Sequence, residues 1–228
     1  MDPVRDEPKD ARAYGRRTFL GVTAVGLSSL LWGRPVWEAV SNPLRQALPP
    51  SLVPSGWRIY TVASSMPTFE PASWRLRIEG LVDRPQTLSY DDLRSLPRAE
   101  QVSTFHCVTG WSVKNVHWAG VRFGDLLAAA APTSDASVLE FISSEIPYVD
   151  TLTLRQVKLH DAMLAYEMDG KPLAREHGAP VRVVIPEMYG YKNVKWVERI
   201  VLRDTVDPGY WEQRGYDVDA WVGGSNGF

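Results

Sequence analysis

Cysteine is almost absent from this sequence, because Cys107 is the only thiol among 228 residues. A single thiol cannot form an internal disulfide, and it cannot build a zinc or iron–sulfur site that needs several cysteines. A Cys-x-x-Cys-His haem attachment is excluded as well. Three roles remain for Cys107: a small apolar packing residue, a nucleophile, or one soft ligand of a metal that has its other ligands elsewhere.

The sequence has no excess of positive charge, and histidine is scarce. The formal net charge is -2 and there are four His residues, so no basic field is available to meet phosphates and we expect no nucleic-acid partner. His117 and His160 have no neighbours at metal-ligand spacing, and we expect them at the surface or at strand ends. Asp91, Asp92 and Glu145 are expected to be caps or solvated charges rather than acid–base pairs.

The first residues do not have the pattern of a folded domain. Arg16 and Arg17 precede an apolar run at residues 19–32, which is the layout of a signal peptide. The paired arginines resemble a twin-arginine signal, which exports folded proteins. An ordinary secretory signal or an uncleaved anchor stays open, because the run approaches the roughly 20 residues of a membrane span only when it is extended to Val40.

The chain is therefore divided into three parts. Residues 1–36 are expected to be the twin-arginine-type signal or N-terminal anchor, and residues 37–56 a proline-rich tether. We expect the protein in the periplasm or at the outer face of the cytoplasmic membrane. Residues 57–228 are expected to form one catalytic domain, since that length is ordinary for a single hydrophobic core.

The domain is predicted to be α+β, because short strand patterns and short helix patterns are mixed along it. Ser89 and Asp92 resemble a capping box that opens a helix ending before Pro97. A second helix is expected at residues 123–131, stopped by Pro132. Strands are expected at residues 74–79, 101–105, 138–142, 181–185 and 195–202, the last with an undecided buried face.

Cys107 is expected at the point where a strand ends and the chain turns. The strand pattern at residues 101–105 is followed by Thr109-Gly110, which favours a turn. Side chains at such ends often point into clefts. His106 is adjacent in a strand and therefore points to the opposite face, which argues against a nucleophile built from Cys107 and His106 alone.

Several blocks of sequence carry a family resemblance. They occur in one order between about Trp57 and about Tyr216, and together they resemble the sulfite-oxidase-type molybdopterin oxidoreductases. A single block of this kind is a weak signal, whereas several in a fixed order are a strong one. The blocks are His106-Cys107-Val108-Thr109-Gly110-Trp111-Ser112, Trp118-Ala119-Gly120-Val121, Asp125-Leu126-Leu127, residues 164–173, residues 177–182, Pro186 with residues 189–196, and residues 209–212.

The resemblance implies a sulfite-oxidase-type molybdopterin-binding fold and a molybdenum–molybdopterin cofactor. Such a centre already has two dithiolene sulfurs, so the protein needs to supply one soft thiolate, and Cys107 is the only candidate. The metal carries the redox chemistry, while the protein binds the cofactor and shapes access to it. The residues implied to contact the cofactor are His177, Arg182, Asn193, Val194 and Lys195, with Ser143 as a further candidate.

Departures from the family pattern bear on the substrate. The branch that oxidises sulfite has arginines shortly after its cysteine, whereas residues 110–113 of this chain contain none and Lys114 is the only nearby cation. The protein-methionine-sulfoxide reductase branch has Glu and Trp at the positions of Thr109 and Trp111. This chain keeps the Trp but not the Glu, so we expect sulfoxide-type chemistry rather than sulfite oxidation, in an altered pocket.

The function expected from these observations is that of an exported molybdenum oxidoreductase, which performs two-electron oxygen-atom transfer on a small-molecule or protein-borne substrate. Without a haem motif it needs a separate electron-transfer partner, such as a membrane haem or flavin protein or a cytochrome. The tail after Leu202 is too short for the dimerisation domain of true sulfite oxidases, so we expect a monomer. The alternatives are a metal-free binding module of the same fold, and a thiol enzyme for which no base is evident.

Overall fold

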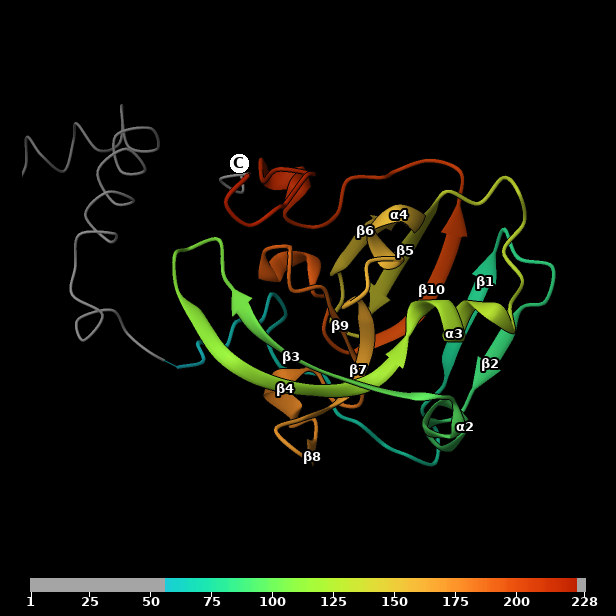
Figure 1. Ribbon diagram of the computed structural model, residues 1–228, viewed down its shortest axis with the longest axis horizontal. Coiled ribbons are helices and arrows are strands. Elements are labelled where there is room, and N and C mark those ends of the chain that lie inside the picture. The colour runs from blue at the N-terminus through green and yellow to red at the C-terminus, as the bar shows by residue number, and fades with distance from the viewer. Residues whose placement is uncertain (1–55, 225–228) are drawn as a thin grey trace, which may run out of the picture. The chain divides into compact units, whose positions relative to one another are not determined.

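The computed structural model describes residues 56–224, which form two sheets and a few short helices (Figure 1). One sheet has the strand order β2-β1-β10-β5-β6, and the other has the order β3-β4-β7-β8 with β9 paired to β7. The strands are β1 (Leu76–Gly80), β2 (Gln86–Leu88), β3 (Arg98–His106), β4 (Ser112–Arg122), β5 (Val138–Ser143), β6 (Val149–Thr153), β7 (Met163–Met168), β8 (Lys171–Pro172), β9 (Arg182–Val184) and β10 (Val197–Arg203).

The helices are short and lie at the ends of strands. Helix α2 (Tyr90–Ser95) opens with a complete capping box, in which the Ser89 hydroxyl and the Asp92 carboxylate each accept a hydrogen bond from the other's backbone amide. Helix α4 (Leu154–Val157) has the same arrangement between Thr153 and Gln156. The remaining helical segments are α3 (Phe123–Ala128) and the 3-10 turns η2 (Arg175–His177), η3 (Gly190–Lys192) and η4 (Glu212–Arg214).

Strand β7 of the second sheet is buried on both faces. Along β7, Leu164 and Tyr166 pack into the larger apolar cluster, together with residues of the first sheet. Met163 and Ala165 alternate with them and pack into a smaller cluster on the opposite face, around Trp118. Because successive strand residues point to opposite faces, apolar residues at both parities indicate that β7 is covered on both sides.

Most of the predicted elements are confirmed. Residues 74–78 alternate between buried and exposed as expected, and the strand beginning there ends at Gly80. The strand before Cys107 is longer than predicted and runs from Arg98 to His106 as one arm of the β3–β4 hairpin. The last predicted strand begins at Val197, and its register shifts between Val197 and Arg199, which explains why no single alternation identified its buried face.

The predicted helix at residues 123–131 is wrong at its C-terminal end. Helix α3 ends at Ala128, and both Ala130 and Ala131 donate their amides back to the Leu127 carbonyl. Ala131 then has a positive φ of 51°. A residue before proline is disfavoured in helical geometry, so Pro132 acts on the turn before it and the helix stops earlier than alanine propensity suggests.

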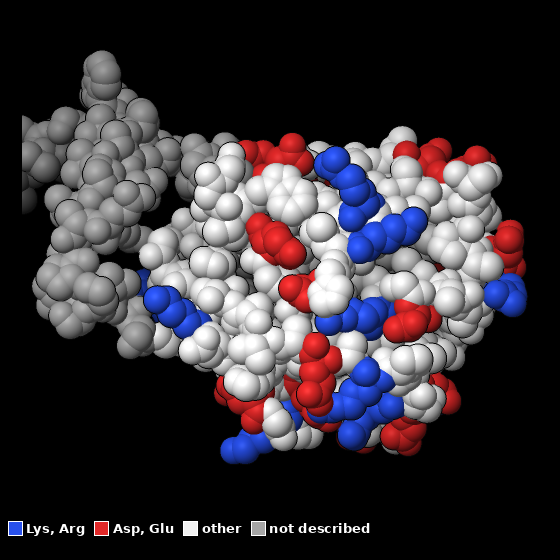
Figure 2. Space-filling view, viewed as in Figure 1, with Lys and Arg blue, Asp and Glu red and all other residues white. Residues whose placement is uncertain are grey.

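The surface of the domain mixes both signs of charge. The face in Figure 2 shows Lys and Arg interspersed with Asp and Glu, without a continuous basic area. His117 and His160 are exposed, as predicted. Within residues 56–224 no helix is long and apolar enough to cross a membrane. The predicted signal, residues 1–36, and nearly all of the tether, residues 37–56, lie outside the described residues.

Gly120 is required by the close approach of β4 and β7. A Cβ atom there would lie 2.1 Å from the Leu164 carbonyl oxygen and 2.6 Å from the Ala165 Cα. We expect Gly120→Ala to lower the free energy of unfolding by about 2 to 4 kcal/mol, measured by urea denaturation of the cofactor-free domain. Gly124→Ala is the control, because nothing lies within 4 Å of that Cβ.

In helix α3 an alanine at position 124 should be neutral or stabilising by about 0.5 to 1 kcal/mol. Equal effects of the two substitutions would contradict the packing of β4 against β7.

Candidate functional site

Cys107 lies in a tight turn between β3 and β4. Its amide donates to the Trp111 carbonyl at 2.9 Å, and its own carbonyl accepts from the Gly110 amide at 3.0 Å. Gly110 has a φ of 87°, a left-handed conformation that glycine adopts without strain. The Cys107 side chain is only partly buried, and its Sγ lies 3.2 Å from the Thr109 hydroxyl. The thiol is thus presented at the end of a strand, as predicted, and not sealed in the core.

A cavity of about 210 Å³ opens beside this turn. Its walls come from segments far apart in the sequence, namely residues 57–62, the β3–β4 turn, the loop after β5, η2, β9, η3 and the C-terminal tail. Five of the residues predicted to bind the cofactor line it. They are Cys107, His177, Arg182, Asn193 and Lys195.

Arg182 is a buried cation without a carboxylate. The residue is 3% exposed, and no ion pair found among the described residues includes it. Its guanidinium donates to the carbonyls of His177 at 3.2 Å and Asn193 at 3.4 Å, and it lies over the rings of Phe105 and Trp118 at 5.4 and 5.3 Å. Burial lowers the pKa of Arg182 to about 10. An unpaired charge in such surroundings favours an anionic or strongly polar ligand.

Lys195 and His177 add two further polar groups to the same wall. The Lys195 ammonium donates to the Tyr60 carbonyl at 2.7 Å and more weakly to a second carbonyl. Burial, followed by repulsion from Arg182, lowers the pKa of Lys195 from 10.5 to about 8. Burial and then Arg182 also lower the pKa of His177, so its imidazole is neutral near pH 7.

Three of the predicted residues support the site through their own hydrogen bonds. Asn193 Oδ1 accepts from the Ile185 amide at 2.7 Å, which fixes the loop after η3. The Val194 carbonyl accepts from the Val183 amide at 2.8 Å, and the Ser143 hydroxyl donates to the Lys195 carbonyl at 2.7 Å. Val194 and Ser143 do not line the cavity, so the structure gives them the position of loop supports.

The prediction that Glu145 is a cap or solvated charge is only half right, because the residue is 3% exposed and lines the cavity. Its carboxylate accepts from the Val62 amide at 2.7 Å and from the Thr61 hydroxyl.

The sequence alone does not identify residues 57–62 as part of the site. This segment has no periodic pattern, and its place is shown by its hydrogen bonds to Glu145 and by the aromatic contacts of Trp57 with Phe105 at 4.9 Å and His177 at 4.8 Å.

These residues fit an anionic organic cofactor with a soft metal. Arg182 has no carboxylate partner among the described residues, and the buried Trp111 Nε1 has no hydrogen-bond partner there. Buried charges are rarely left without an opposite charge, and buried donors rarely without an acceptor, so both point to a group that binds in the cavity. Cys107 adds a thiol at the same cavity, and thiolates bind soft metals. A phosphate-bearing pterin dithiolene with molybdenum meets each of these requirements.

The comparisons with known proteins agree with this chemistry. Residues 63–211 match the model of the oxidoreductase molybdopterin binding domain. That match covers well over half of the 228 residues, and the chain therefore belongs to this family of molybdopterin-dependent oxidoreductases.

Its relatives include proteins with named activities. The uncharacterised oxidoreductase YuiH of Bacillus subtilis is 37% identical over 150 residues, which is 65% of this chain and 75% of YuiH. The putative protein-methionine-sulfoxide reductase subunit YedZ1 of Azospira oryzae is 29% identical over 191 residues, 83% of this chain and 71% of that protein. The protein-methionine-sulfoxide reductase catalytic subunit MsrP of Ralstonia nicotianae is 31% identical over 159 residues, 63% of this chain and 48% of MsrP.

A solved structure confirms the predicted fold. The sulfane dehydrogenase SoxCD from Paracoccus pantotrophus superposes with a TM-score of 0.59 at 26% identity, over 63% of this chain and 41% of that chain. The predicted α+β sulfite-oxidase-type fold, the molybdopterin cofactor and the enzymatic class are thus confirmed. This chain spans only about half the length of MsrP and less of the SoxCD chain.

The unpaired charge of Arg182 predicts a trade-off between stability and binding. We expect Arg182→Met to raise the free energy of unfolding of the cofactor-free protein by about 1 to 3 kcal/mol, because a side chain of similar length replaces an uncompensated buried cation. The same variant should retain less molybdopterin than the wild type. Denaturant unfolding and cofactor fluorescence after release measure the two quantities.

Arg77→Met is the control, since Arg77 is exposed on β1. It should change stability by no more than about 0.5 kcal/mol and leave cofactor content unchanged. A cofactor-free Arg182→Met protein less stable than the wild type would contradict the view that this cation is unpaired.

Proposed function

We propose that the chain is an exported molybdenum-dependent reductase of sulfoxides, small or protein-borne, with Cys107 as the protein ligand of the metal. The observation that carries the proposal is that Cys107, the only thiol of the chain, lines the same cavity as Arg182, a cation without a carboxylate partner in the described part of the chain. A thiol placed only for packing would not need such neighbours. A thiol nucleophile would need a base, and the polar atom found beside Sγ is the Thr109 hydroxyl.

Each cavity residue has a distinct part in this proposal. Arg182 and Lys195 bind the anionic end of the cofactor, and the carbonyl contacts of their side chains orient them. His177, neutral near pH 7, offers one donor and one acceptor without adding charge. Trp111 offers the unpartnered Nε1 donor. The aromatic rings around them exclude water, which strengthens every polar contact inside.

Bound molybdenum supplies two-electron oxygen-atom transfer. In the proposed reaction a sulfoxide takes up two electrons and two protons and yields a thioether and water. The electrons come from a separate redox protein, because the sequence contains no haem attachment motif. The chain's own residues hold the cofactor and shape the entrance to it.

The lining of the cavity favours a sulfoxide over sulfite. Trp57, Ile59, Tyr60 and Val108 give the cavity an apolar and aromatic lining, in which Arg58 is the exposed cation. The turn at residues 110–113 contains no arginine that would hold a small anion. A thioether sulfoxide is neutral and carries apolar substituents, so it matches these walls better than a dianion does. The names of YedZ1 and MsrP support the same substrate class.

Export and partnership complete the proposal. The twin-arginine-type pattern at residues 16–20 supports delivery of a folded, cofactor-loaded protein to the periplasm or the outer membrane face. There a membrane haem or flavin protein, or a cytochrome, is proposed as electron donor to a monomeric enzyme.

Substitution of the thiol tests the ligand assignment. We expect Cys107→Ser to remain folded but to lose nearly all molybdenum and all reduction of methionine sulfoxide by a reduced viologen dye, because a serine hydroxyl is a poor ligand for a soft metal. Elemental analysis and a thermal unfolding scan measure metal and fold. His106→Gln is the control, since its side chain does not line the cavity, and it should keep its molybdenum.

Full metal content and activity in Cys107→Ser would overturn the ligand assignment. A wild-type protein that contains molybdenum but oxidises sulfite faster than it reduces sulfoxides would overturn the substrate class alone.

The lowered pKa of Lys195, about 8, predicts opposite pH trends for binding and stability. Cofactor affinity should weaken as the pH rises above about 8, because Lys195 of the cofactor-free protein then loses the proton that attracts the cofactor's phosphate. The stability of the cofactor-free protein should instead rise from about pH 8 towards 10.5, since the unfolded chain binds the Lys195 proton more tightly than the folded chain. Cofactor release rates and urea unfolding at each pH measure both trends, and Lys195→Met should flatten them. Identical pH profiles in wild type and variant would refute this assignment.

A further inference from the structure

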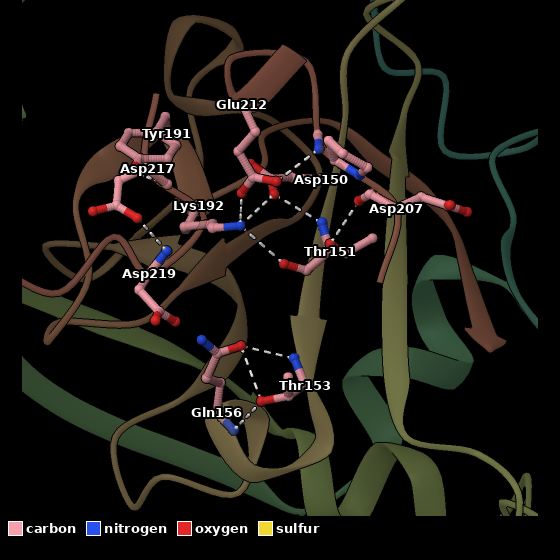
Figure 3. Close-up of polar contacts among 12 residues, drawn as sticks. Asp150, Thr151, Thr153, Gln156, Tyr191, Lys192, Asp207, Glu212, Asp217 and Asp219 are labelled. Atoms are coloured by element: carbon pink, nitrogen blue, oxygen red, sulfur yellow. Dashed lines mark hydrogen bonds and ion pairs between the residues drawn. The ribbon is translucent and has the colours of Figure 1, made fainter. Parts of the chain in front are cut away.

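A second buried cation, Lys192, does not line the cavity, and its charge is fully paired with carboxylates. Its side chain is 1% exposed, and its ammonium contacts the Asp150 carboxylate at 2.8 Å and the Glu212 carboxylate (Figure 3). It also donates to the Thr151 carbonyl at 3.2 Å. We call Lys192, Asp150 and Glu212 the Lys192 cluster. None of its members lines the cavity.

The Lys192 cluster joins three separate parts of the chain. Asp150 belongs to β6, an edge strand of the first sheet, and Lys192 ends η3. Glu212 belongs to η4 in the C-terminal segment, residues 207–222, which we call the tail. Figure 3 shows the three side chains converging from these elements. One ammonium thus links the sheet, the segment before Asn193 and the tail.

Backbone contacts show how closely the tail lies against the sheet at this point. The Gly209 amide donates to the second oxygen of Glu212 at 2.8 Å, and a Cβ on Gly209 would lie 2.7 Å from the Asp150 carboxyl carbon. The Tyr210 amide donates to the Val149 carbonyl at 2.8 Å. The tail therefore covers the free edge of β6, and the cluster forms at the closest approach.

From this anchor the tail delivers two aromatic side chains to the cavity. Trp211 precedes Glu212, and both Trp211 and Tyr216 line the cavity. The Tyr216 ring lies 5.1 Å from that of Trp211 and 5.3 Å from that of Tyr191, the residue before Lys192. We call Trp211 and Tyr216 the tail wall. Trp211 is thus next to Glu212 in sequence, and Tyr216 packs against Tyr191, which is next to Lys192.

The charges of the cluster make its geometry restrictive. One ammonium faces two carboxylates, all three groups are almost fully buried, and the Asp150 Oδ2 has no protein partner among the described residues. Burial raises the pKa of Asp150, while Lys192 opposes that change. A cluster of this kind gives little net stability compared with apolar packing, but it tolerates few alternative arrangements. It therefore suits fixing one position of the tail better than holding the fold together.

We propose that the Lys192 cluster is a positioning device for the cofactor site, which fixes the tail wall against η3 so that the cavity closes around the cofactor. The side chains of the cluster do not line the cavity. They act on the cofactor site through the backbone segments whose positions they fix. The proposal rests on the family's cofactor and not on which substrate is reduced.

The test uses Glu212→Gln, which keeps the shape of the side chain and removes its charge. The full-length, cofactor-loaded protein is dialysed, and molybdenum per chain is measured together with the rate of trypsin cleavage after Arg214, an exposed residue of the tail. We expect cleavage to be about tenfold faster and molybdenum to be lost faster, because a charge-assisted hydrogen bond that closes the tail is weakened. The thermal unfolding midpoint should change little.

Glu140→Gln is the matched control. Glu140 lies on β5, is 9% exposed, and pairs with Arg203 at 2.8 Å without lining the cavity. This variant should lose one ion pair yet keep wild-type tail protection and cofactor retention. Tail cleavage and molybdenum loss equal in the two variants would overturn the proposal. Faster cleavage with unchanged molybdenum, or molybdenum loss with a protected tail, would overturn it as well.

Lys192→Met provides the stronger perturbation, since it leaves two carboxylates facing each other. Leu139→Ala supplies a matched loss of global stability, because it creates a cavity in the core at a fully buried position of β5. At temperatures where both remain folded, only Lys192→Met should lose cofactor quickly. If Lys192→Met does not fold, the Glu212→Gln comparison decides. The wild-type metal content tests the proposed function separately, because the inference depends on differences between variants.

Discussion

A guanidinium buried without a carboxylate is unfavourable for the folded chain, and Arg182 is in that position. Carbonyl groups and the faces of Phe105 and Trp118 partly compensate its charge. The rest of the site is arranged so that an external anion can complete the compensation. Lys195 lies in the same wall and repels Arg182, which raises the cost of leaving both cations without a ligand. The free energy lost on folding is therefore available for binding the cofactor.

The two sheets make this arrangement possible because β7, inside the second sheet, packs against apolar side chains on both faces. Its strand ends bring the Cys107 turn and Arg182 into one interior cavity, and the first sheet supplies the loop after β5 and the edge to which the tail binds. Neither sheet alone encloses the site. Residues 57–62 and the tail close the remaining sides, so the cavity depends on contacts between segments that are distant in sequence.

The sequence predicted what depends on local pattern and on motif. The Ser89 cap, the strand before Cys107 and the turn at Gly110 follow from residue preferences within a few positions, and the structure has all three. Motif resemblance placed His177 and Arg182 at the cofactor site, and both line the cavity. Glu145 could not be predicted, because a glutamate after a strand is usually solvated, and the hydrogen bonds that explain its burial come from the distant residues Thr61 and Val62. The same holds for the Lys192 cluster, whose members come from three segments with no shared pattern.

Arg182 and Lys192 are both buried cations, and their surroundings differ in a way that separates structure from function. Lys192 has two carboxylates and a carbonyl, so its charge is neutralised within the chain. Arg182 has carbonyls and aromatic rings, and its pKa is lowered because that environment does not replace water. A protein selected only for stability would pair or replace both. One satisfied and one unsatisfied cation give a rigid frame beside an incomplete site, and this is why we propose Arg182, rather than the equally buried Lys192, as the residue that binds the cofactor's anionic end.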